Sequence, residues 1–270
     1  MLTPPPGQRL LMAAAIIVAT AAGVVGAIML IAPSSTGRSF AWPLGPRALA
    51  ALVGGLYVVS APVFAYAGRR SALEVRGLAA AVLAFTLPTL AATYLHRAIF
   101  DFDRIFAVTW VVLFVASPVT FALLLWSGRR AQPPPDDPRV HPAARVVLAA
   151  LGAAFAGLAV WFWVRATGPV PFEVTPLGAR FLAAWLAFFA VLAAWPAARA
   201  ARSEARVPLL ALTTYGIGGL LAAAVHPQDL GPGVGGYVAA LLIVVAVPAL
   251  VLAFAVKTLR RQTTRNSPPK

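Results

Sequence analysis

The chain has 270 residues, of which 60% are hydrophobic and only 11% are charged, and its mean hydropathy is +0.83. Soluble domains carry about 25% charged residues, so this composition excludes a water-soluble globular fold. The formal charge of +14 is scattered over short polar segments between long apolar ones, which argues against a nucleic-acid-binding surface. The chain has no cysteine, which excludes disulfides, thiolate metal sites and cysteine nucleophiles.

The apolar residues fall in eight segments, each close to the roughly 20 residues that a helix needs to cross a bilayer. They lie at 10–31, 48–67, 78–95, 105–126, 146–164, 181–198, 208–225 and 237–256. None alternates apolar and polar residues, so membrane strands are excluded. The first segment is longer than the apolar region of a secretory signal and is interpreted as an uncleaved span. The sequence predicts an all-α, polytopic membrane protein with eight transmembrane helices.

One eleven-residue motif, called the repeated word below, occurs twice in the chain. "WPLGPRALAAL" at 42–52 and "TPLGARFLAAW" at 175–185 agree at seven of eleven positions, 133 residues apart. Beyond the word the offset settles at 130, which aligns Glu74, Arg76, His96, Pro118 and Arg130 with Glu204, Arg206, His226, Pro248 and Arg260. These matches predict two copies of a four-helix unit. Because each unit has an even number of spans, the copies are parallel and related by an axis along the membrane normal.

The predicted organisation has four parts. Residues 1–130 form the first four-helix membrane repeat, 131–145 a Pro-rich cytoplasmic linker, 146–262 the second repeat and 263–270 a cytoplasmic tail. The doubled "PLGxR" helix entrance, the eight spans and the Arg-rich, Lys-poor composition resemble uncharacterised eight-helix membrane proteins of actinobacterial type. That resemblance implies the same architecture and no active residues.

The basic residues also predict the orientation. With the N-terminus inside, sixteen Lys or Arg residues fall on the inner side and six on the outer side. Because basic residues accumulate in cytoplasmic segments, we expect a multi-pass protein of the inner (plasma) membrane with both termini cytoplasmic. The six outer residues are Arg38, Arg47, Arg97, Arg104, Arg165 and Arg180.

Catalytic signatures are absent. The chain contains no HExxH, GxSxG or P-loop motif. "GPGVGG" at 231–236 and "DFD" at 101–103 are interpreted as surface turns, and all eight acids are expected in loops. The pairs Glu74/Arg76 and Glu204/Arg206 are interpreted as helix-entrance charges. We therefore expect no catalytic residue, no metal and no cofactor.

The repeated arginines Arg47 and Arg180 are candidate ligand-binding residues, because they recur and oppose the charge bias. Interfacial arginines commonly extend toward lipid phosphates, which is the simpler interpretation. The functional interpretation is a symmetric outer pair that binds an anionic head group or closes onto Asp101, Asp103 or Glu173.

A second candidate lies at mid-membrane, where "FTLPTL" (85–90) aligns with "YGIGGL" (215–220). Pro88 and Gly218 weaken the third helix of each repeat at matching positions, and such interruptions often mark a central site. The alternative is close helix packing by small residues. Hydroxyls that are candidates to satisfy the freed carbonyls belong to Thr86, Thr89, Thr213 and Thr214.

The third candidate is the pair His96 and His226, each at the outer end of a weakened helix. Two imidazoles at one depth are able to bind haem or share a transition metal, or to act as a protonation switch. The interpretation adopted is an interfacial histidine that hydrogen-bonds water or a head group, without a cofactor.

The leading hypothesis is binding or transport of a hydrophobic or amphiphilic small molecule at the interface between the repeats. The alternative is a non-catalytic interaction or assembly subunit, and a third is a membrane enzyme or haem protein that uses His96 and His226. The expected partners are the lipid bilayer and a lipid-like ligand or another membrane protein, with no nucleic acid.

Overall fold

The computed structural model describes the backbone of residues 6–265 and the side chains of residues 9–38 and 40–254. Its long helices are α1 (Pro6–Ile31), α3 (Arg47–Val58), α4 (Ser60–Ala67), α5 (Ala72–Leu95), α6 (Ile105–Gly128), α7 (Pro142–Arg165), α8 (Pro176–Arg199), α9 (Arg202–Val225) and α10 (Val234–Arg265). Short helices in the connections are η1 (Pro33–Ser35), α2 (Thr36–Ser39), η2 (Arg97–Ile99) and η3 (Pro227–Asp229).

The helices α3 and α4 together form one span, so the described residues contain eight helices that are long and apolar enough to cross a membrane. All eight predicted apolar segments lie inside these helices, and no strand occurs between residues 6 and 265. The predicted fold class is confirmed: the chain is an all-α, integral, multi-pass membrane protein.

Side-chain caps explain why several helices begin earlier than their apolar segments. Ser71 and Glu74 form a capping box at the start of α5, and the Thr175 hydroxyl accepts from the Gly178 amide at the start of α8. Such caps satisfy backbone donors that the first turn leaves unpaired. Polar first turns are therefore helical although hydropathy does not mark them.

The repeated word folds differently in its two copies. In the second copy α8 begins at Pro176, and the Ala179 amide donates to the Thr175 carbonyl over 2.8 Å. The first copy has Pro46 where the second has Ala179. Proline has no amide proton to donate and restricts the residue before it. The helix α3 therefore begins about one turn later, at Arg47.

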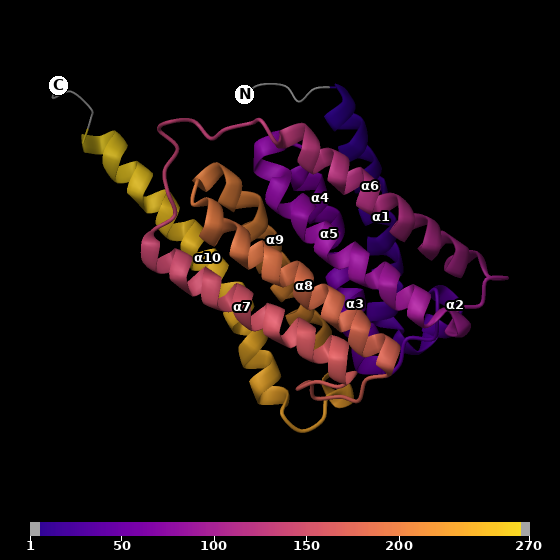
Figure 1. Cartoon of the computed structure of the whole chain (residues 1–270). Coiled ribbons are helices and arrows are strands. Elements are labelled where there is room, and N and C mark those ends of the chain that lie inside the picture. Colours follow the sequence, from indigo (N-terminus) through magenta and orange to yellow (C-terminus); the bar gives the residue numbers. More distant parts are fainter. Residues whose placement is uncertain (1–5, 266–270) are drawn as a thin grey trace.

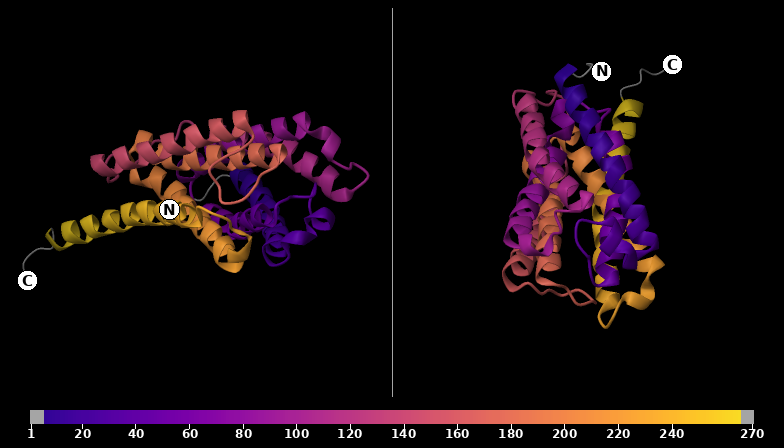
Figure 2. Two further views of the ribbon diagram at one scale, coloured as in Figure 1. Left: turned by 90° about the horizontal axis from the view of Figure 1, so that it is seen from below. Right: turned by 90° about the vertical axis from the view of Figure 1, so that its right-hand side faces the viewer.

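The start of α1 and the end of α10 lie at the same end of the molecule (Figures 1 and 2). The connection 129–141 lies there too, so this end is called the linker end and the opposite one the loop end. The helix α7 begins at Pro142, inside the predicted linker 131–145, because proline suits the first position of a helix. The predicted tail 263–270 lies outside the described residues from 266 onward.

Four inner spans form the centre of the bundle, and four outer spans pack against them. Half or more of the residues are buried in α3–α4, α5, α8 and α9, against fewer than a third in α1, α6, α7 and α10. Helices in corresponding places of the chain pack in corresponding pairs: α1 on α3 and α7 on α8, α5 on α6 and α9 on α10, α5 on α8 and α9 on α3. The inner helices α5 and α9 also contact each other at the centre.

Backbone packs directly on backbone where α3 crosses α9. A Cβ on Gly55 would lie 2.2 Å from the carbonyl oxygen of Gly218, and one on Gly218 would lie 2.6 Å from that of Gly55. The corresponding crossing of α5 and α8 is filled by aromatic rings instead, with Phe85 and Trp185 centroids 4.4 Å apart. The two crossings therefore differ in how closely the helices approach.

We expect Gly55→Ala to destabilise the protein by about 1–3 kcal/mol, the range for overpacking a filled interior. The reason is that the new methyl group has no space unless α3 and α9 separate. Unfolding in mixed detergent micelles measures the change. The matched control is Gly157→Ala on α7, where a Cβ meets nothing within 4 Å; equal destabilisation by both changes would contradict the role of the crossing.

Candidate functional site

The predicted residues at the loop end meet partners in the opposite half of the chain. The Arg180 guanidinium on α8 donates to Nε2 of His96, which caps the C-terminal end of α5. Burial first, and then the positive charge of Arg180, lower the pKa of His96. His96 is therefore held as the neutral acceptor of an arginine hydrogen bond.

The second histidine has a different set of contacts. His226 at the end of α9 is buried, and its Nε2 donates to the Leu30 carbonyl at the end of α1 over 2.5 Å. Its Nδ1 lies 3.6 Å from a carboxylate oxygen of Asp229, and that oxygen lies 3.5 Å from Nε of Arg47 on α3. Arg180 of the second half therefore lies beside His96 of the first, and Arg47 of the first half lies near His226 of the second, with Asp229 between them.

These contacts show what the four residues do in the structure. Among the described residues no hydrogen bond joins His96 to His226, and no group of three His, Cys, Asp or Glu side chains is placed to hold a metal. Arg47, His226 and Asp229 form one cluster, and Arg180 and His96 form the other. The arginines and histidines, predicted as two separate pairs, are thus combined as two arginine–histidine clusters.

The mid-membrane candidates have structural partners. Thr86 and Thr89 donate to the carbonyls of Val82 and Phe85, and Thr213 and Thr214 donate to those of Leu209 and Leu210. Pro88 removes the donor to the Ala84 carbonyl, so none of these bonds replaces the missing one. Gly218 packs closely against Gly55. This corresponds to the alternative interpretation of these segments, close helix packing by small residues.

A cavity of about 420 Å³ lies between α1 and α6. Its α1 wall consists of small side chains, and its α6 wall mixes aromatic, aliphatic and hydroxyl side chains. Phe40 and Ala41 close it toward the loop end. Rim residues on both helices, such as Ala14 and Thr109, are exposed, so the cavity opens on the side of the bundle.

The inner wall of the cavity comes from both halves of the chain. It contains Tyr57, Ser60, Phe85, Thr86, Trp185, Phe188 and Tyr215. The Ser60 hydroxyl donates to the Leu56 carbonyl over 3.1 Å and lies 3.0 Å from the Tyr215 hydroxyl. Since a serine hydroxyl has one proton, Tyr215 donates to Ser60. The Tyr215 oxygen keeps its lone pairs as an acceptor in the cavity wall.

The helix of this span is irregular next to Ser60. The helix is interrupted at Val59, between α3 and α4, three residues before Pro62. Proline removes one helical donor and crowds the preceding turn.

Of the predicted site residues, Thr86 alone lines the cavity. The aromatic residues Phe85 and Tyr215, at the first positions of the two aligned segments, line it as well.

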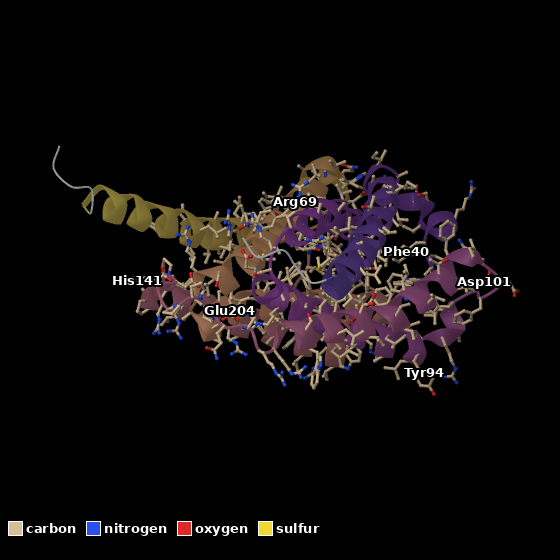
Figure 3. All side chains as sticks on the ribbon, turned by 90° about the horizontal axis from the view of Figure 1, so that it is seen from above. Phe40, Arg69, Tyr94, Asp101, His141 and Glu204 are labelled. Atoms are coloured by element: carbon tan, nitrogen blue, oxygen red, sulfur yellow. The ribbon has the colours of Figure 1, made fainter. Side chains whose placement is uncertain are left out.

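A buried ion pair near the linker end was not predicted. Nη2 of Arg76 on α5 lies 2.5 Å from Oε1 of Glu204 on α9, and Nη1 donates to the Gly128 carbonyl at the end of α6 over 3.2 Å. Their side chains are only 10% and 4% exposed. Figure 3 labels Glu204 on the same side of the view as His141, away from Asp101.

The predicted helix-entrance position agrees with the structure for both glutamates, but the prediction did not include the ion pair of Arg76 with Glu204. Glu74 accepts from the Ser71 amide over 3.0 Å in the capping box of α5. Arg76 and Glu204 instead join three helices, and both glutamates lie in helical first turns rather than in loops. The available signal was the Glu-x-Arg spacing that occurs once in each half.

The stability of wild-type protein should fall as the pH drops below about 6.5, the ordinary pKa of histidine. The folded pKa of His96 is lowered, so acid protonates the unfolded chain first, and the contribution present above pH 6.5 is lost as the pH falls toward the folded value. Thermal unfolding at several pH values measures this loss. His96→Gln and Arg180→Gln should each reduce the acid sensitivity; an unchanged slope in both variants would contradict the contact.

Glu204→Leu should destabilise the protein by about 3–5 kcal/mol, because it leaves the Arg76 guanidinium buried without its carboxylate. The double variant Arg76→Met, Glu204→Leu should recover most of the loss, since no buried charge remains. The control Glu74→Gln keeps the capping box and breaks only the 3.9 Å pair with Arg70, for which less than about 1 kcal/mol is expected. A double variant as unstable as the single one would show that the buried charge is not the cause.

Comparison with protein-family models, curated proteins and solved structures gives no match to this chain.

Proposed function

We propose that the protein binds a hydrophobic or amphiphilic small molecule in the cavity between α1 and α6. The observation that carries this proposal is a side-opening cavity of about 420 Å³ with a mainly apolar and aromatic lining. That volume lies within the roughly 300–1,000 Å³ of small-molecule sites, which combine such linings with a few polar groups.

The position of the opening indicates the route of entry. The cavity rim lies on α1 and α6, two outer spans that leave most of their residues unburied within the chain. The surface of outer spans contacts the hydrocarbon of the bilayer. A ligand dissolved in the bilayer therefore reaches the cavity without passing through water.

The polar groups of the inner wall restrict the ligand further. Tyr215 and Thr86 both use their protons inside the protein, on Ser60 and on the Val82 carbonyl. Both oxygens therefore remain as acceptors. A ligand with a hydroxyl donor beside a long apolar part fits this arrangement best.

Binding is favoured over transport through the centre. The crossing of α3 and α9 is closed by backbone contact at Gly55 and Gly218, and that of α5 and α8 is filled by rings of Phe85, Trp185 and Phe188. The proposed ligand site therefore lies in the first half, and not at the interface between the repeats, where the sequence predicted it. The second half contributes Trp185, Phe188 and Tyr215 to its inner wall.

We also retain the tandem repeat, the inner-membrane location and the cytoplasmic termini as parts of the proposal. The matching helix pairs support the repeat, and the charge bias supports the orientation. A Cβ on Gly178 would lie 2.7 Å from Leu49 and 4.0 Å from the Gly45 carbonyl, so the two copies of the repeated word lie close together, as an axis between them requires. The resemblance to actinobacterial-type proteins rests on the same word.

A long-chain alcohol that carries a diazirine should label peptides of α1 and α6 in the purified protein, detected by mass spectrometry. Ala19→Phe, which fills the cavity, should abolish this labelling. Ala13→Phe on an exposed position of α1 is the matched control and should leave it unchanged. Equal labelling of both variants would contradict the cavity as the site.

Tyr215→Phe tests the polar anchor. One lost hydrogen bond corresponds to roughly a two- to tenfold weaker affinity for the alcohol, whereas the methyl ether of the same alcohol should bind both proteins alike. If the alcohol and the ether respond equally, the acceptor role of Tyr215 is wrong.

A further inference from the structure

A second hollow lies at the linker end between α7 and α10, with α9 behind it. This groove has a volume of about 710 Å³. Its apolar wall includes Ala144 and Val147 on α7, Leu209 on α9, and Val247, Val251 and Phe254 on α10. Figure 3 labels His141, which precedes α7, at the edge of the molecule near α10.

The rim of the groove is basic. Arg139, Arg202 and Arg206 line it together with His141, and no described acid lines it. Arg139 and Arg206 are exposed, and Arg202 is half-buried. Three cationic side chains thus surround one end of an otherwise apolar groove.

The neighbouring acids are engaged elsewhere. Asp137 accepts from the Ser203 amide and hydroxyl over 3.1 and 2.6 Å, at the start of α9. Glu204 binds Arg76 over 2.5 Å. Within the described part of the chain, no carboxylate forms an ion pair with the three rim arginines. Their charge is available to an anion from outside.

We propose that this groove binds an anionic phospholipid. Arginine guanidinium groups recognise phosphate by paired hydrogen bonds, and the apolar wall along α7 and α10 fits an acyl chain. Arg202 begins α9, and Arg139 lies three residues before α7, so the rim lies at helix ends, where lipid head groups are found.

Two comparisons within the structure support this choice of ligand. A free phosphate ion has no apolar part that could pack on the wall of the groove. The apolar wall therefore favours a lipid as the source of the phosphate. The α1–α6 cavity has no basic residue in its lining, so the two hollows differ in chemistry. The phospholipid site does not depend on the proposed function of that cavity.

Native mass spectrometry of the purified full chain tests the proposal. Phosphatidylglycerol and phosphatidylcholine with identical chains are added in turn, and the fraction of protein that retains one lipid is measured. Wild-type protein should retain phosphatidylglycerol preferentially. The triple variant Arg139→Gln, Arg202→Gln, Arg206→Gln should bind it on the order of a hundredfold more weakly, at roughly fivefold for each basic residue near an anionic head group.

The matched control removes the same charge at the same end, at the exposed positions Arg69, Arg129 and Arg130, and should bind like wild type. Equal losses in the two triple variants would mean general charge attraction and overturn the site. Ala144→Trp, which fills the groove, should also remove binding, whereas Ala149→Trp on an exposed position of the same helix should not. Equal retention of both lipids by wild type, or displacement of phosphatidylglycerol by inorganic phosphate, would overturn the phospholipid assignment.

Discussion

The backbone contact between Gly55 and Gly218 is the interaction on which the remaining helix arrangement depends. Within a bilayer apolar side chains gain little by leaving lipid for protein, so helices associate mainly by close fit. Gly55 and Gly218 bring α3 and α9 together, and α1 and α10 pack on these two helices. A further close approach, between Gly26 of α1 and Gly54 of α3, extends the same principle outward. The central pair thus defines where the outer helices lie.

Charged side chains join the two halves at both ends of this bundle, and in between the Ser60 and Tyr215 hydroxyls do so. At the loop end Arg180 meets His96, and Arg47 meets Asp229; near the linker end Arg76 meets Glu204. Every one of these pairs joins the first half of the chain to the second. Buried charges are costly to leave unpaired, so the Arg76–Glu204 pair penalises separation of the halves most, whereas the exposed Arg47 contributes less. The polar groups therefore specify how the halves fit together, whereas small and aromatic residues supply the packing between them.

The sequence was sufficient for the spans and insufficient for the partners of individual side chains. A long apolar segment crosses a bilayer as a helix, because its backbone groups must be hydrogen-bonded within the segment. All eight helices could therefore be predicted from hydropathy. The repeat drew attention to Arg47, Arg180, His96 and His226 because they recur, but recurrence does not say which residues meet. The structure pairs arginines with histidine regions across the halves. The cavity was missed because its wall combines α1, α6 and four other spans, and such combinations depend on helix rotation that hydropathy does not determine.

The same offset that aligns the repeated words explains why the two halves differ in their hollows. An offset of 133 places Ala190 and Ala193 opposite Tyr57 and Ser60 of the cavity wall. With small residues on α8, Gly152 of α7 approaches its backbone, and a Cβ there would lie 3.1 Å from the Ala190 carbonyl. The first half has larger polar and aromatic side chains at these positions, beside α1 and α6. Its cavity therefore lies within the span, while the groove of the second half lies where α7 and α10 diverge at the linker end. Side-chain size at these positions thus distinguishes the first half, which has a cavity beside α1 and α6, from the second, where α7 packs closely on α8.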